Sequence, residues 1–410
     1  MEFIPVLFIC LSVTYLISWI FRRIGLPHIL GHLTTGLIIS IPVISRQIFN
    51  DQNSMTIFST IANLGLIFLL FFIGLKINVN SLMKFSKRSI NISFLSALVP
   101  FALGFICGQL LGMDFFGSMI LGASLSVTAE AVSGAILEEL NMINTRIGLI
   151  IIEAGIIDDI FEVLTLAAIG TIIQSQNTIS SVADTGLNGV GNILLDVMIF
   201  IGLIYIVRFI FIPITFKLLG KEPSHSDLFT ASFIVVLFMA AISSYLSLGT
   251  VIGALIAGII VKQTLLRENK KDEEIEITDI VETLTFGFLE PIFFIWIAYT
   301  ADIFTLIQTP SYLYMALFIT AVATGGKILG SVVGNVLDGG NVREGILIGW
   351  GMNARGAVEL IAIKMSLDHG LIEPVIFSSI VFMTFVTTIV SPIIFKILAK
   401  YHTKVYLKST

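Results

Sequence analysis

Charged side chains are scarce in this sequence of 410 residues. Lys, Arg, Asp and Glu make up 12% of it, hydrophobic residues make up 56%, and the mean hydropathy is +0.99. Soluble domains carry about twice that share of charge, so this class is excluded. Apolar runs near the ~20 residues needed to cross a bilayer follow one another almost without interruption. The composition therefore predicts an all-α polytopic membrane protein.

Cysteine is also rare. Cys10 and Cys107 both lie in apolar segments, which excludes a disulfide framework and a thiol-based metal site. The N-terminal segment has no basic region and no small-residue cleavage site, so we interpret it as a retained first span rather than a signal peptide. We expect no cofactor and no nucleic-acid partner.

About thirteen apolar segments are separated by turn and charge signals. Their approximate bounds are 3–21, 27–45, 55–77, 88–111, 114–139, 146–173, 189–219, 226–246, 248–265, 279–301, 311–336, 342–367 and 371–398. The strongly polar connection from Arg267 to Asp279 is interpreted as a solvated loop. Residues 399–410 form a short tail.

The distribution of Lys and Arg predicts the orientation of the chain. Connections after odd-numbered segments and the tail hold most of these residues, whereas connections after even-numbered segments hold only Arg46. The positive-inside rule then places the N-terminus outside and the C-terminus in the cytoplasm. This orientation requires an odd number of spans, which the count of about thirteen satisfies. We interpret the membrane as the plasma membrane.

Three weak internal similarities occur at one offset of seven segments. They relate 66–84 to 289–307, 31–40 to 251–260, and 128–137 to 353–362. An odd offset predicts two inverted repeats of six helices, one over about 3–173 and one over about 226–398, joined by a connector helix over about 189–219. Such repeats place a substrate site near the bilayer midplane, where they meet.

Two corresponding segments are interrupted by polar residues and glycine. One holds Ser126, Thr128 and Glu130, and the other holds Asn353 and Arg355. Such interruptions predict two crossing, discontinuous helices that line a site, because unwound backbone is tolerated in a membrane only against protein or water. Ser126 and Thr128 are candidate ion ligands and Asn353 is a secondary candidate. Glu130 and Arg355 are interpreted as a structural ion pair, with direct cation transport by Glu130 as the alternative.

Two adjacent carboxylates, Asp158 and Asp159, lie in the middle of the segment EAGIIDDIFEVL. Each is costly in a bilayer, on the order of 2.5–3.5 kcal/mol, so a purely structural role is disfavoured. A proton or a small hard cation can neutralise the pair, and each can displace the other. Carboxylate oxygens suit Na⁺, Li⁺ or Ca²⁺ better than a soft metal.

Lys327 is the third charged candidate, near the middle of an apolar segment with glycines on both sides. A lysine beside a carboxylate can hold or release a proton as its partner is occupied, although a lysine can also reach the membrane interface. Glu153 and Glu162 flank the Asp pair and are secondary site candidates. Glu162 is one helical turn beyond Asp158, where it is a secondary ligand or lines an aqueous funnel.

The chain resembles the monovalent cation:proton antiporter superfamily, in the branch of bacterial and archaeal sodium/proton antiporters that have an Asp-Asp pair. The residues that carry the resemblance are AGIIDDI (154–160), GLPHILGHLTTG (25–36), SVTAEAV (126–132), GGKILG (325–330) and GMNARGAVELI (351–361). It implies a core domain, a panel-like dimerisation domain in a homodimer, and elevator-type alternating access. It also implies that Asp159 is the principal Na⁺ ligand and that Asp158 is the partner of Lys327.

Three other functions remain open at this point. A K⁺/H⁺ antiporter of the same fold is disfavoured by the intact Asp pair and the short tail. The segment DDIFE has the spacing of Mg²⁺-dependent membrane prenyltransferases, but a second acidic motif is lacking. A channel is disfavoured because paired titratable groups in broken helices favour coupled exchange. The sequence therefore predicts an electrogenic Na⁺(Li⁺)/H⁺ antiporter rather than an enzyme.

Overall fold

The computed structural model describes residues 3–49, 51–76, 86–158, 161, 169, 202–212, 214, 225–245, 250–267 and 271–406, and every regular element in these ranges is helical. Seven of the described helices are long and apolar enough to cross a membrane, or eight if one bent pair counts as a span. The predicted all-α polytopic class is confirmed. The number of thirteen spans, the repeats and their boundaries stay predictions.

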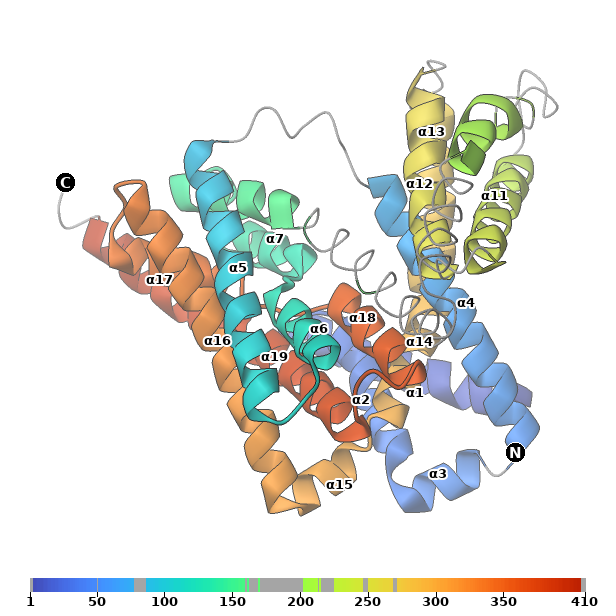
Figure 1. Cartoon of the computed structure of the whole chain (residues 1–410), viewed down its shortest axis with the longest axis horizontal. Helices are drawn as coiled ribbons and strands as arrows, with labels where there is room; N and C mark the ends of the chain where they lie inside the picture. The colour runs from blue at the N-terminus through green and yellow to red at the C-terminus, as the bar shows by residue number, and fades with distance from the viewer. Residues whose placement is uncertain are drawn as a thin grey trace, which may run out of the picture. The chain divides into compact units, whose positions relative to one another are not determined.

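The chain divides into two compact units, each with its own helices (Figure 1). The second unit covers Gln52–Asn78 and Ala167–Phe293, and its described helices include α4 (Gln52–Lys76), α11 (His225–Tyr245), α12 (Thr250–Arg267) and α13 (Lys271–Leu284). In this unit α12 packs against both α4 and α11. The first unit covers Met1–Asp51, Val79–Leu166 and Phe294–Thr410, and it holds the described residues of the predicted site.

In the first unit, α1 (Phe3–Arg23), α2 (Ile29–Ser40) and α3 (Pro42–Ile48) lead the chain. The remaining helices are α5 (Lys87–Leu110), α6 (Phe115–Ser126), α7 (Glu130–Glu139), an unlabelled helical segment over 146–158, the end of α14 (Glu290–Thr300), α15 (Ile303–Gln308), α16 (Pro310–Leu337), α17 (Val342–Gly351), α18 (Ala357–Asp368) and α19 (Pro374–Tyr406).

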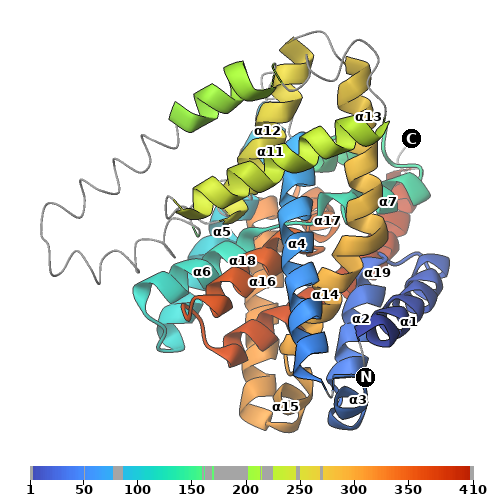
Figure 2. The same cartoon turned by 90° about the vertical axis from the view of Figure 1, so that its right-hand side faces the viewer.

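Two of the predicted spans are broken helices, as the sequence indicated. The helix α6 ends at Ser126 and α7 begins at Glu130, while α17 ends at Gly351 and α18 begins at Ala357. The two interruptions touch, because the backbone N–H of Ala129 donates to the carbonyl of Ala354 at 2.8 Å. In Figures 1 and 2 alike, α6 lies beside α18. The crossing leaves no space at Gly356, where an added Cβ would lie 2.8 Å from the Cβ of Ala129.

A row of glycines brings α16 against α5. An added Cβ at Gly326 would lie 2.8 Å from the Cα of Pro100, one at Gly330 would lie 2.3 Å from the carbonyl oxygen of Leu95, and Gly334 meets α5 in the same way. Small residues spaced four apart allow helix backbones to approach closely in membranes. This contact fixes the position of α16, and therefore of Lys327, against α5.

Replacing Gly330 with alanine should lower the free energy of unfolding by about 1–3 kcal/mol, because the new methyl group overlaps the α5 backbone. The matched control is Gly325→Ala in the same helix, where an added Cβ meets nothing within 4 Å and stability should be unchanged or slightly higher. Thermal unfolding in detergent measures both. Equal effects of the two substitutions would contradict the close packing.

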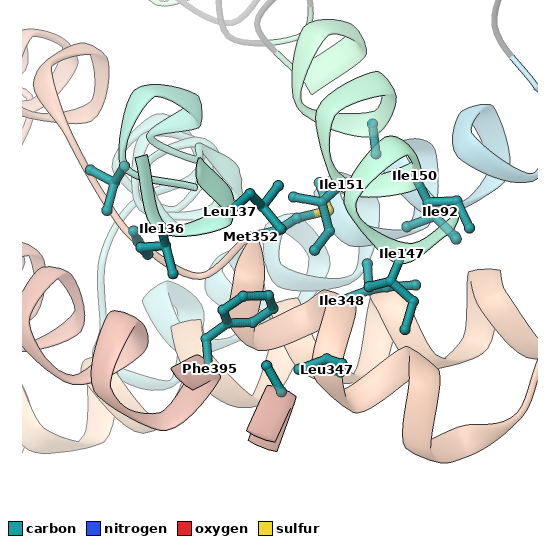
Figure 3. Close-up of a cluster of buried hydrophobic side chains, with 14 residues drawn as sticks. Ile92, Ile136, Leu137, Ile147, Ile150, Ile151, Leu347, Ile348, Met352 and Phe395 are labelled. Atoms are coloured by element: carbon teal, nitrogen blue, oxygen red, sulfur yellow. The ribbon is translucent and has the colours of Figure 1, made fainter. Parts of the chain in front are cut away.

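An apolar cluster in the first unit joins helices that are distant in the sequence. It includes residues of α5, α7, segment 146–158, α17 and α19, and Figure 3 shows Leu137, Ile151 and Met352 gathered above the ring of Phe395. Burial of these side chains is favourable at about 25 cal/mol per Å² against an aqueous reference, and their close packing also acts in lipid. The cluster therefore ties segment 146–158, which ends at Asp158, to both broken helices.

One sequence interpretation is wrong. The connection predicted as a solvated loop is helical from Lys271 onward, since α13 runs to Leu284 and continues into a π-helical turn, η3 (Thr285–Leu289), and α14. Its first turn is acidic, which suits a helix N-terminus, and the side chains of Ile277 and Val281 are buried one turn apart. The predicted span 27–45 contains a bend of 92° at the break between α2 and α3, and whether the pair forms one span stays a prediction.

Candidate ion and proton site

Asp158 lies at the centre of a buried polar cluster. Its side chain is 2% exposed, and its Oδ2 accepts hydrogen bonds from the hydroxyl of Thr128 at 2.7 Å and from Nζ of Lys327 at 2.7 Å. Its Oδ1 accepts from the hydroxyl of Ser93 at 3.2 Å. Three donors from α5, the α6–α7 interruption and α16 thus satisfy one carboxylate, which suits a charge placed deep in a membrane protein.

Lys327 completes this cluster from α16. Its side chain is fully buried, and Nζ donates to the backbone carbonyl of Ser126 at 2.9 Å as well as to Asp158. The carbonyl of Ser126 belongs to the last turn of α6, where helix carbonyls lack partners within the helix and carry partial negative charge. The lysine therefore does not reach an interface, and its charge is stabilised by one carboxylate and one helix end.

Arg355 crosses from the second broken helix to the first. Its Nη1 donates to the carbonyl of Val127 and its Nη2 donates to the carbonyl of Ala323 at 3.5 Å. Its Nη1 also lies 4.0 Å from Oε2 of Glu359, one turn later in the chain. The side chain of Glu130 lies outside the described residues, so its predicted pairing with Arg355 stays a prediction.

Three hydroxyl groups of α19 form hydrogen bonds with the second interruption and with the first turn of α18. They lie at i, i+4 and i+7, which places them on one helix face. Thr384 donates to Oε1 of Glu359, Thr388 donates to the carbonyl of Arg355 at 2.8 Å, and Ser391 accepts from the side-chain amide of Asn353 at 3.0 Å. Asn353 thus contacts α19 and, at 3.5 Å, Thr324 of α16. The predicted ligand Asn353 holds the crossing in place on this side.

Glu153 lies apart from Asp158, at the N-terminus of α5. Its Oε2 accepts from the backbone N–H of Ser86 at 3.2 Å and from the hydroxyl of Ser89 at 2.6 Å. A carboxylate in this position stabilises a helix N-terminus. Glu153 therefore links segment 146–158 to α5. Asp159 and Glu162, the other acids of this stretch, lie outside the described residues.

The structure thus brings Ser126, Thr128, Asp158 and Lys327 together and places Asn353 and Arg355 across the crossing. Sequence reasoning missed Ser93 as a ligand of Asp158, and it missed Glu359 and the hydroxyl groups of α19. The recurrence of Thr384, Thr388 and Ser391 on one face of an apolar helix was the available signal, since hydroxyl groups on a membrane helix face often donate across helices.

Comparison with known proteins supplies the family. The model of the sodium/hydrogen exchanger transmembrane family matches residues 9–401. A Na(+)/H(+) antiporter of Enterococcus hirae is 27% identical and covers 99% of this chain and 100% of its own. The Na(+)/H(+)-K(+) antiporter GerN of Bacillus cereus is 26% identical and covers 90% of this chain and 89% of its own.

A solved structure shares the fold of this chain. The sodium proton antiporter MjNhaP1 of Methanocaldococcus jannaschii matches 95% of this chain and 95% of its own with a TM-score of 0.66 at 17% identity. Since the family model covers nearly the whole sequence and the fold is shared, the chain belongs to the sodium/hydrogen exchanger family of membrane transporters, within the monovalent cation:proton antiporter superfamily.

Proposed function

We propose that this protein is a secondary active antiporter that exchanges Na⁺ or Li⁺ for protons at Asp158 and Asp159. The observation that carries the proposal is the buried ion pair of Asp158 and Lys327, which lies at the crossing of two broken helices. A buried ion pair contributes little net stability by itself, so its position in the membrane interior points to transport. The relatives described as Na⁺/H⁺ antiporters support the choice of substrates.

The cation ligands in this proposal are hard oxygen atoms. Asp159 supplies the principal carboxylate and Asp158 supplies the second, while the hydroxyl of Thr128 and the carbonyl of Ser126 complete the set. The carbonyl of Ser126 and Oδ2 of Asp158 are both bonded to Nζ of Lys327 in the structure. A cation that arrives at these oxygens therefore competes directly with the lysine.

This competition gives the exchange its stoichiometry. In the empty site Asp159 holds a proton and Lys327 pairs with Asp158. An arriving Na⁺ displaces the proton from Asp159 and breaks the ion pair, after which Lys327, separated from Asp158, releases its own proton. Two protons leave for each Na⁺ that binds, so the full cycle moves one net charge and is electrogenic.

The oligomeric state and the transport movement in this proposal follow from the resemblance to known antiporters, and the orientation follows from the distribution of Lys and Arg. The protein is a homodimer in the plasma membrane, with the N-terminus outside and the C-terminus in the cytoplasm. Access alternates by an elevator movement that carries the site across the bilayer together with the helices that hold it. The unwound segments at 127–129 and 353–356 move with the site, because the hydrogen bond from Ala129 to Ala354 joins them.

The cation is tested with purified protein in liposomes that contain a pH-sensitive dye and an acidic interior. Addition of NaCl or LiCl outside should release internal protons, while choline chloride should not. KCl is the critical comparison, since the name of the relative GerN includes K⁺. Proton release by KCl alone would assign a K⁺/H⁺ antiporter, and no release by any of the three alkali cations would refute the proposed function.

A further inference from the structure

A second buried carboxylate faces the crossing, and the proposed exchange cycle does not use it. Glu359 in the first turn of α18 is fully buried. Its Oε1 accepts from Thr384, and its Oε2 lies 4.0 Å from Nη1 of Arg355. Among the described residues, Oε2 makes no hydrogen bond. A buried carboxylate in this state is costly unless a cation lies close to it, and the cation here is Arg355.

Arg355 links this carboxylate to the proposed ion ligands. The same Nη1 that faces Glu359 donates to the carbonyl of Val127. Val127 lies between Ser126, whose carbonyl accepts from Lys327, and Thr128, whose hydroxyl donates to Asp158. A continuous series of contacts therefore runs from Glu359 through Arg355 and the extended segment 127–129 to Asp158.

We propose that Glu359 is a positioning residue for the ion site: its carboxylate attracts the guanidinium of Arg355 and keeps it against the carbonyl of Val127, which fixes Ser126 and Thr128 for the cation. The proposal deepens the proposed function and rests on it. Glu359 does not touch the cation. It acts through Arg355, and its negative charge lowers the positive potential that the guanidinium adds at the crossing.

The pairing itself is tested by stability, without any transport measurement. Arg355→Gln and Glu359→Gln should each lower the midpoint of thermal unfolding in detergent by several degrees, because each removes one of two opposite charges that lie 4.0 Å apart in a fully buried position. The double variant should be less destabilised than the sum of the two. The matched comparison is the same cycle with Glu130→Gln, which measures the other predicted partner of Arg355. Strict additivity for Arg355 and Glu359 would overturn the inference.

The link to the ion site is tested by transport kinetics in liposomes. Glu359→Gln should raise the apparent KM for Na⁺ by about fivefold while the maximal rate stays near that of the wild type, since one negative charge beside the guanidinium of Arg355 is lost and the potential at the crossing becomes more positive. Glu359→Asp keeps the charge and should restore the wild-type KM. Thr384→Val removes the hydrogen bond to Glu359 but not the charge, so its KM should change less than that of Glu359→Gln.

The proposed antiport function and the positioning role of Glu359 can be refuted separately. If the wild type shows no Na⁺-driven proton flux, the proposed function is wrong, while the stability cycle still reports on the pair. If the wild type exchanges Na⁺ and Glu359→Gln leaves its KM unchanged, the positioning role is wrong. Should Glu359→Gln alone fail to fold, the KM is measured in Thr384→Val, which keeps the charge of Glu359 and removes its hydrogen bond. A KM that is raised, though by less than about fivefold, supports the role, and an unchanged KM contradicts it.

Discussion

Replacing Asp159 with asparagine is expected to abolish Na⁺-driven proton release while the protein stays folded. The substitution removes the charge for which protons and Na⁺ compete, but it keeps the size of the side chain. Thermal stability should rise slightly, because one of two adjacent acids in an apolar segment no longer repels the other. Dye dequenching in liposomes measures the exchange, and thermal unfolding in detergent measures the stability.

The matched control for this result is Asp368→Asn. Asp368 pairs with Lys364 one turn earlier in α18, and its side chain is about half exposed. Loss of this carboxylate should leave Na⁺-driven exchange close to the wild-type rate, since Asp368 is about half exposed and pairs with a lysine that is not part of the proposed ion site. Normal exchange by Asp159→Asn would refute the assignment of the ion site.

Replacing Lys327 with glutamine has the second large expected effect. The variant loses the proton that Lys327 releases on each cycle, so any exchange that survives should be electroneutral, with one proton for each Na⁺. It should also lose about 3–5 kcal/mol of stability, because Asp158 remains buried without its cation partner. The proton flux is measured with and without an imposed membrane potential, together with thermal unfolding.

Lys364→Gln is the control for charge removal from a lysine. Lys364 is also largely buried, but it pairs with Asp368 rather than with Asp158. Its loss should leave the voltage response of the exchange unchanged. A voltage-dependent flux in Lys327→Gln would mean that another group carries the second proton.

The broken helices and the polar cluster at their crossing could be predicted from the sequence, because the physical cost of each feature is local. A carboxylate or a lysine in an apolar segment is expensive wherever it lies, so Asp158 and Lys327 stand out without any structure. Glycine and polar residues in the middle of a span likewise indicate unwound backbone. These signals need no knowledge of neighbouring helices.

Features that depend on tertiary contacts were not predictable in this way. The recurrence of Thr384, Thr388 and Ser391 on one face of α19 indicates contacts with a neighbouring helix, but their partners appear only when α19 lies against the second interruption and the start of α18. The role of Glu359 also depends on tertiary contacts. It lies one turn from Arg355, and Arg355 in turn binds the carbonyl of Val127 in the α6–α7 interruption. The connection after Arg267 was misassigned because its charge suggested a loop, whereas its apolar residues are spaced to bury one helix face.

The voltage dependence of the wild-type exchange tests the central claim most directly. With Na⁺ added outside liposomes, one Na⁺ enters and two protons leave, so each cycle carries one positive charge outward. A potential of 100 mV then contributes about 2.3 kcal/mol per cycle, equivalent to roughly a fiftyfold Na⁺ gradient. A K⁺-diffusion potential that makes the interior positive should accelerate proton release, and one that makes it negative should slow it. Release that is indifferent to the potential would contradict the account and would indicate an electroneutral exchanger in which Lys327 only stabilises the crossing.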